Sequence, residues 1–124
     1  TDRHSAFYAR RAEGGAGLIT SEPLYILPNG RELPTQLAIY DDRFVEGLHS
    51  LTDAVHAVGG RMMAHINHAG RAVNPKLVPE GERVSASAMR CPANQVTPRP
   101  LTLSEIPTYI QAYADAARRA YQAG

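Results

Sequence analysis

The feature that most constrains the fold is a repeated order of helical segment, Gly-Gly pair and short apolar stretch. Residues 41–60 place apolar side chains three or four positions apart, which predicts an amphipathic helix closed by glycine. The apolar stretch 61–66 follows at once, so a strand is expected there. Residues 4–15 and 17–21 repeat the order. Strands that alternate with helices in this way predict parallel pairing.

The last part of the chain, residues 101–124, predicts a third helix. Thr102 and Glu105 have the spacing of a capping box, and Pro107 favours a start near Ser104, since proline is tolerated in a first helical turn. One stripe of this helix is apolar, and we expect it to pack: Ile106, Ile110, Tyr113, Ala117 and Tyr121.

Two strands are too few for three amphipathic helices. Parallel sheets are stable when helices cover them and enough strands share the core. We therefore expect a piece of a larger α/β fold, although 124 residues could form one domain. Its apolar faces would contact a second chain, a covalent remainder or another copy, so we expect an oligomer.

Residues 71–101 form a long proline-rich segment without periodicity. Ordered loops longer than ~12 to 15 residues are uncommon, and such segments are usually functional or disordered. If ordered, this one is expected over the C-terminal end of the strand that precedes it. Open α/β sheets and barrels bind their ligands at that end.

Composition excludes several classes of function. Basic and acidic residues are balanced at 13 and 12, without a basic stripe, so nucleic acid is not an expected partner. The single cysteine, Cys91, cannot form an internal disulfide, which favours a reducing cytoplasm. No apolar run approaches the ~20 residues of a membrane span.

The stretch 61–75, "RMMAHINHAGRAVNP", raises the question of what His65 and His68 do. A metal site, a catalytic pair and ordinary polar residues at a strand end are the alternatives. Residues three apart on a strand point to opposite faces, so the two rings would chelate one ion only if the strand kinked. No nucleophile elbow of the GxSxG type is present. We expect no metal ligands.

Several motifs occur in a familiar order: "YARRAEGGAGLITSE", "PNGRELP", "YDDRFVEGLHSLTDAVHAVGG", "HAGR" and "RPLTLSEI…YADAARRAYQAG". Together they resemble the old yellow enzyme family of flavin oxidoreductases, with most likeness to the branch of 2,4-dienoyl-CoA reductase and trimethylamine dehydrogenase. The resemblance implies a (β/α)8 TIM barrel with FMN at the C-terminal mouth of its strands. Residues 1–124 would be a partial flavin-binding domain containing about strands two and three with their helices, incomplete without the others.

The resemblance also implies which residues meet the cofactor. Glu22 and Pro23 stand where the family's backbone approaches the flavin ring, and Pro23 has no N–H to donate. His65 stands where the family pattern Q-x-x-H-x-G-R has a glutamine that contacts the flavin pyrimidine edge. His68, Gly70 and Arg71 are retained and would shape the loop. The chain itself would supply no catalytic residue.

The expected function is part or subunit of an FMN-dependent oxidoreductase that moves hydride between NAD(P)H, flavin and an activated C=C bond of a small molecule. FMN would be shared with strands outside the chain, which alone would be inactive. The family branch also includes enzymes with a 4Fe-4S cluster, which this chain would not bind. The alternative is a non-catalytic structural subunit that retains the scaffold without the cofactor.

Overall fold

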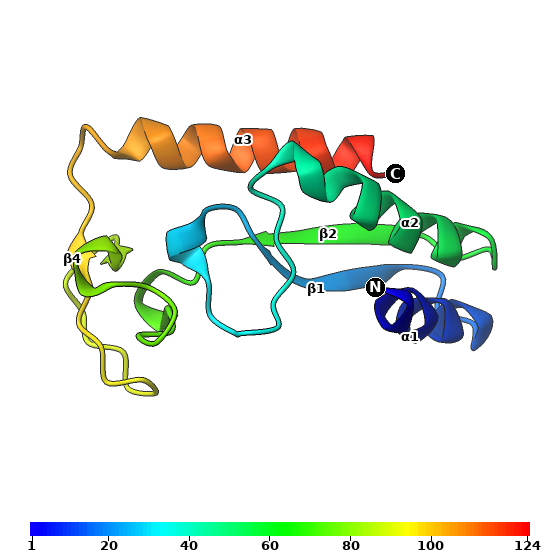
Figure 1. Ribbon diagram of the computed structural model, residues 1–124, viewed down its shortest axis with the longest axis horizontal. Coiled ribbons are helices and arrows are strands. Elements are labelled where there is room, and N and C mark those ends of the chain that lie inside the picture. The colour runs from blue at the N-terminus through cyan, green and yellow to red at the C-terminus, as the bar shows by residue number, and fades with distance from the viewer.

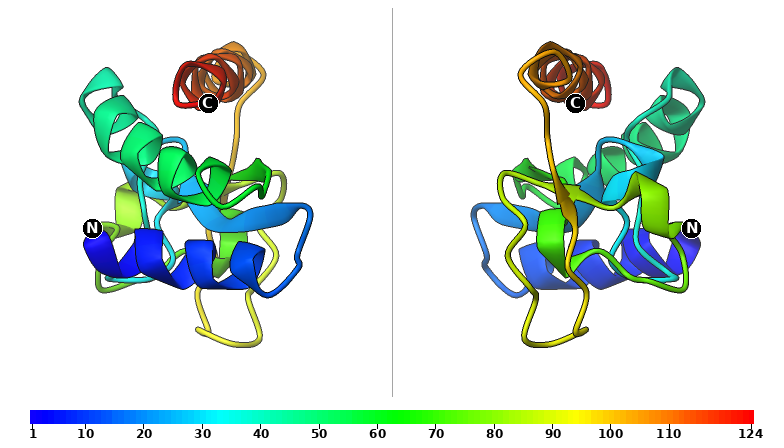
Figure 2. Two further views of the ribbon diagram at one scale, coloured as in Figure 1. Left: turned by 90° about the vertical axis from the view of Figure 1, so that its right-hand side faces the viewer. Right: turned by 90° about the vertical axis from the view of Figure 1, so that its left-hand side faces the viewer.

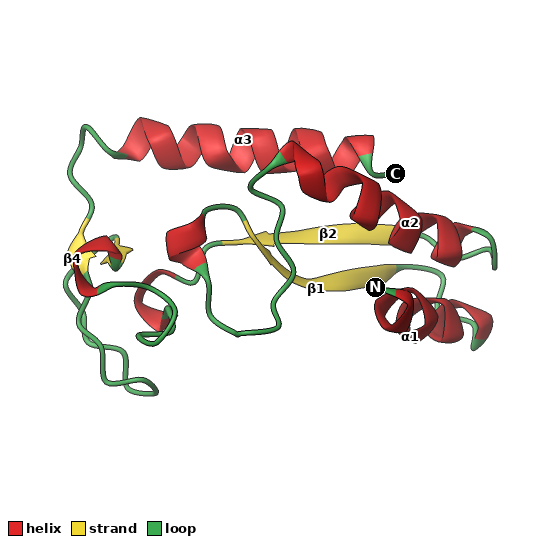
Figure 3. Cartoon of the chain, in the orientation of Figure 1, coloured by secondary structure: helices red, strands yellow, loops and turns green.

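The computed structural model describes residues 1–124 and contains the expected alternation of helices and strands (Figures 1 and 3). Its main elements are α1 (Asp2–Glu13), β1 (Ile19–Tyr25), α2 (Val45–His56), β2 (Met62–Asn67) and α3 (Ile106–Gln122). Two short strands, β3 (Val84–Ser85) and β4 (Arg99–Pro100), form a second sheet. The short 3-10 helices are Pro28–Gly30, Asp42–Phe44, Gly70–Ala72 and Glu80–Glu82. None of the helices has the length and apolar character needed to cross a membrane.

β1 and β2 pair in parallel, as expected, and form a sheet of only two strands. β1 runs past the expected end at residue 21 and includes Pro23. Proline removes a ladder donor and is tolerated in sheets mainly at edges and bulges. A register shift between Thr20 and Pro23 marks such a bulge.

Glycines close α2 and allow it to approach its neighbours. Gly59 has a φ of +83°, the left-handed conformation that ends a helix without steric cost. A Cβ atom on Gly60 would lie 2.7 Å from the Cβ of Ala12 and 2.8 Å from Cγ1 of Val55. The Gly-Gly pair therefore ends the helix and permits close packing between α1 and α2.

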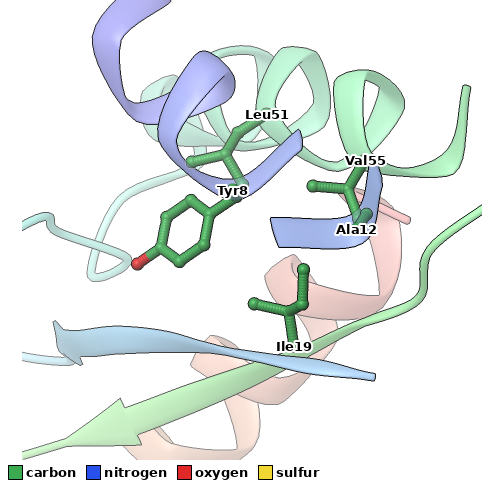
Figure 4. Packing of buried hydrophobic residues seen from close by; sticks show 5 residues of the cluster. All are labelled: Tyr8, Ala12, Ile19, Leu51 and Val55. Atoms are coloured by element: carbon green, nitrogen blue, oxygen red, sulfur yellow. The ribbon is translucent and has the colours of Figure 1, made fainter. Parts of the chain in front are cut away.

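The first core joins α1 and α2 to the start of β1 (Figure 4). Its buried members come from all three elements: Tyr8, Ala12, Ile19, Leu51 and Val55. Figure 2 shows α2 between α1 and α3, with the helices spread around the strands. This arrangement leaves the other face of the sheet without a helix, and Met63 there is half exposed.

The second core packs α3 against β2 and the C-terminal end of β1. Its buried residues are Leu24, Ile26, Ile39, Ala112 and Ala116. The expected apolar stripe points away: Ile110 is 65% exposed and Tyr121 89% exposed. Alanines face the sheet because their small side chains let the helix backbone approach closely, and the larger residues remain for other contacts.

Residues 71–101 are ordered and lie beyond the C-terminal ends of β1 and β2, as expected (Figure 1). The parallel pair β3–β4 ties the middle of this segment to its C-terminal end. Arg83 donates to the carbonyl oxygens of Val78 and Pro75, at 2.9 and 3.0 Å. The segment is therefore a folded cover at the end of the sheet where α/β proteins bind ligands.

Candidate functional site

The register of the main sheet brings together two of the expected cofactor contacts. Pro23 on β1 is the Cα partner of His65 on β2. His65 is exposed, whereas its neighbours Ala64 and Ile66 turn toward the second core. The His65 side chain thus belongs to the face that no helix covers.

The imidazole of His65 is free. The hydrogen bond of this residue uses its backbone N–H, and the ring takes part in no hydrogen bond or ion pair of the structure. A neutral imidazole offers one donor and one acceptor on divergent directions, and a protonated one offers two donors. His65 can therefore bind a polar ligand edge without breaking an existing contact.

Glu22 has a different environment. Its N–H donates to the Tyr8 hydroxyl at 2.7 Å, and its Oε1 accepts the N–H of Leu37 at 3.2 Å. These bonds attach α1 and the loop before α2 to the bulge in β1. A contact between Glu22 and a cofactor stays a prediction, and both of these groups already stabilise the fold.

Pro23 offers a ligand its ring and no N–H. A flavin ring system has a broad apolar face beside a polar edge, and an apolar proline beside a free imidazole is compatible with both. The pair on the uncovered face therefore fits FMN, with the restriction that Pro23 cannot donate a hydrogen bond.

Sequence reasoning missed Ser21. Its Oγ accepts the N–H of His65 at 3.0 Å and donates to the Glu22 carbonyl at 2.8 Å. One sequence signal could have identified it: a hydroxyl residue stands just before Glu-Pro in a strand. Proline has no N–H to donate to the neighbouring strand, so another group has to make the hydrogen bonds there.

His68 lies at the exit of β2 and shapes the loop, as expected. Its Nδ1 accepts the Gly70 N–H at 3.1 Å, so Nε2 carries the proton and donates to Oδ1 of Asn29 at 3.3 Å. Its ring meets that of Tyr109 edge-on, and the Tyr109 hydroxyl accepts from Nδ2 of Asn29. A Cβ on Gly30 would lie 2.6 Å from the His68 ring. Burial lowers the pKa of His68.

The structure does not join the two histidines in a metal site. Both nitrogens of His68 are engaged in hydrogen bonds. No group of three or more His, Cys, Asp or Glu side chains is placed to hold a metal ion. His65 and His68 therefore have separate environments, one open and one enclosed.

Comparison with known proteins gives consistent matches. The family model for the NADH:flavin oxidoreductase / NADH oxidase family matches residues 1–124. The NADH oxidase of Thermoanaerobacter brockii is 37% identical over 92% of the chain, and the NADH:acrylate oxidoreductase of Vibrio harveyi is 37% identical over 95%. The structure of the old yellow enzyme homologue from Zymomonas mobilis matches 100% of the chain with 34% identity and a TM-score of 0.91.

The chain spans only a part of each of these proteins. It covers 18% of the Thermoanaerobacter protein, 12% of the Vibrio protein and 37% of the Zymomonas structure. The expected fold is confirmed by this last match: the chain is an α/β segment of a TIM-barrel structure, with parallel strands and no closed barrel.

Proposed function

The chain belongs to the NADH:flavin oxidoreductase / NADH oxidase family, and from this membership we propose that it forms one wall of an FMN site in an oxidoreductase. FMN would supply the hydride chemistry, accepting from NADH or NADPH and reducing an activated C=C bond. The name of one relative, NADH:acrylate oxidoreductase, supports that substrate class, since acrylate has an activated C=C bond. The remaining barrel strands would come from sequence outside these 124 residues, in the same chain or in a partner.

One observation carries the proposal: the side-by-side placement of Pro23 and the free imidazole of His65 on the face that no helix covers. In this proposal Pro23 supports the apolar ring system, while His65 binds the polar edge of the cofactor. Glu22 contributes through the backbone of the bulge that it stabilises. The folded cover of residues 71–101 limits access of water to the C-terminal ends of β1 and β2, where the cofactor would bind.

The imidazole of His65 adds an electrostatic role. Where a glutamine amide presents a donor and an acceptor side by side, a histidine can also carry a positive charge. A cation at this position would stabilise negative charge on the reduced cofactor and raise its potential. The role of this chain is therefore to bind and to tune the cofactor, and the proton donors of the reaction would lie elsewhere.

A second candidate is a structural subunit that has kept the scaffold and lost the cofactor. The absence of an N–H on Pro23 favours it, as does the engagement of the Glu22 N–H and carboxylate within the fold. In that case this chain would bind no FMN. A nicotinamide, a small-molecule substrate or a 4Fe-4S cluster would then also have no site next to it.

Flavin binding by the full-length protein that contains these residues separates the candidates. The purified wild type is expected to carry FMN. His65→Ala is expected to weaken FMN binding about tenfold through the loss of one net hydrogen bond, measured by titration of the apoprotein. His4→Ala, on α1, is the matched control and should leave binding unchanged.

The matched variant His65→Gln tests the charge. The midpoint potential of the wild type should exceed that of His65→Gln by an amount that grows as the pH falls. A pH-independent difference would contradict the electrostatic role. A colourless wild type that does not bind added FMN would contradict the oxidoreductase proposal and favour the structural subunit.

A further inference from the structure

We propose that Ser21 is a positioning residue, whose hydroxyl holds the peptide groups of Pro23 and His65 in register so that both side chains meet the cofactor together. The inference rests on the proposed function, because that proposal assigns the cofactor contacts to Pro23 and His65. Ser21 itself touches no cofactor in this proposal.

The first step is the bulge. Thr20 pairs with Met63 and Pro23 pairs with His65, so three steps along β1 correspond to two along β2. An extra residue leaves the ladder locally disrupted. Pro23 adds to the disruption because it has no N–H. The two candidate contacts therefore sit where the main-chain hydrogen bonds are least able to fix them.

The second step is the replacement of main-chain bonding by a side chain. The Ser21 hydroxyl accepts from the His65 N–H on one strand and donates to the Glu22 carbonyl on the other. Its single proton is thereby committed, and its position is set by both strands. Ser21 is half-buried, while its bond to His65 lies on the exposed face of the sheet.

The third step is that no other side chain does this work. The Tyr8 hydroxyl accepts from the Glu22 N–H, and the Glu22 carboxylate accepts from Leu37. Both bonds hold the bulge to α1 or to the loop before α2. Of the side chains bonded at the bulge, Ser21 alone reaches β2. Its loss should release the His65 peptide while the bulge stays attached on its other side.

The test uses variants that separate the hydroxyl from the shape of the side chain. Ser21→Thr keeps the hydroxyl, and Ser21→Val has nearly the shape of threonine without a hydroxyl, so the comparison of these two variants isolates the hydroxyl. Thr20→Val removes a neighbouring hydroxyl that makes no hydrogen bond in the structure and serves as the control for amide exchange. All are made in the full-length protein, with thermal unfolding measured to confirm that each variant folds.

Two readouts are compared. In the protein without flavin, hydrogen exchange of the His65 amide should become at least about tenfold faster in Ser21→Val and stay near the wild-type rate in Ser21→Thr. In the protein with flavin, Ser21→Val should weaken FMN binding about tenfold and shift the midpoint potential, and Ser21→Thr should restore both.

An unchanged exchange rate of the His65 amide in Ser21→Val overturns the inference. Faster exchange with unchanged FMN affinity and potential also overturns it, because the hydroxyl would then be structural only. A wild type that binds no FMN overturns the proposed function instead, and the exchange rates still decide whether Ser21 holds His65 in register.

Discussion

His65 and His68 are three residues apart and have opposite relations to solvent and to hydrogen bonding. The His65 ring is open to a ligand, while the His68 ring is enclosed and has a partner for each nitrogen. A protonated His68 could no longer accept the Gly70 N–H. The enclosed ring therefore makes the join between β2 and the segment beyond it sensitive to acid.

The pH dependence of stability follows from the lowered pKa of His68. Burial holds the pKa of the folded state below the ordinary value of 6.5, so the unfolded chain takes up this proton first as the pH falls. The contribution of His68 to stability should be complete above pH 6.5 and should decrease below it. Urea unfolding of the full-length protein at several pH values measures this decrease.

The variant His68→Gln should flatten that part of the profile, because glutamine does not titrate. His4→Gln serves as the control and should leave the decrease in place. A wild-type stability that is constant from pH 7 down through 6.5 and below would contradict the assignment of an enclosed, neutral His68.

The helices and strands were predictable from the sequence because their signals are local. Apolar periodicity and the Gly-Gly pairs predicted α1, α2 and the strands that follow them. The face of α3 that packs against the sheet was not predicted. Periodicity identifies side chains that share a stripe, but the alanines, not the bulkier residues, fit against β1 and β2. Ser21 was missed because its role depends on the register between two strands, which the sequence of one strand does not contain.

The close approach of α1 and α2 gives a prediction for Gly60. In Gly60→Ala the new methyl group would meet the side chains of Ala12 and Val55 at less than 3 Å. Overpacking of this kind is expected to lower the free energy of unfolding by about 1–3 kcal/mol. Urea unfolding of the full-length protein measures the change.

Gly47→Ala is the matched control within α2. A Cβ at this position meets no atom within 4 Å, and alanine favours the helix. It should raise the free energy of unfolding by about 0.5–1 kcal/mol. Equal effects of the two substitutions would contradict the packing described for Gly60.

As a whole, the molecule leaves large apolar side chains exposed on two surfaces, the sheet face without helices and the outer face of α3. Helices cover one face of the sheet, while Met63 on the other face and Ile110 and Tyr121 on α3 remain exposed. Exposed apolar groups of this kind mark contact surfaces. Together with the 37% coverage of the Zymomonas structure, they support the proposal that further barrel strands and helices contact these surfaces.

Residues 1–124 expressed alone should therefore self-associate, which sedimentation velocity would measure. Ile110→Lys should reduce the association by placing a charge on the exposed stripe of α3. Gln111→Lys, at an exposed position about 100° around the helix from Ile110 and off this stripe, is the control and should reduce it less. A monomeric wild-type fragment would contradict the view that these surfaces need partners.

The segment beyond the strands is held largely by its own bonds, with Arg83 bonded to Val78 and Pro75 and Asn94 bonded to Val73. Residues 86–90, within it, are all exposed. Changes there touch few of the contacts that fix the sheet. Over evolutionary time, related proteins can therefore change residues 86–90 by substitution or insertion. They can acquire new specificities in this way while the sheet and its helices still fold.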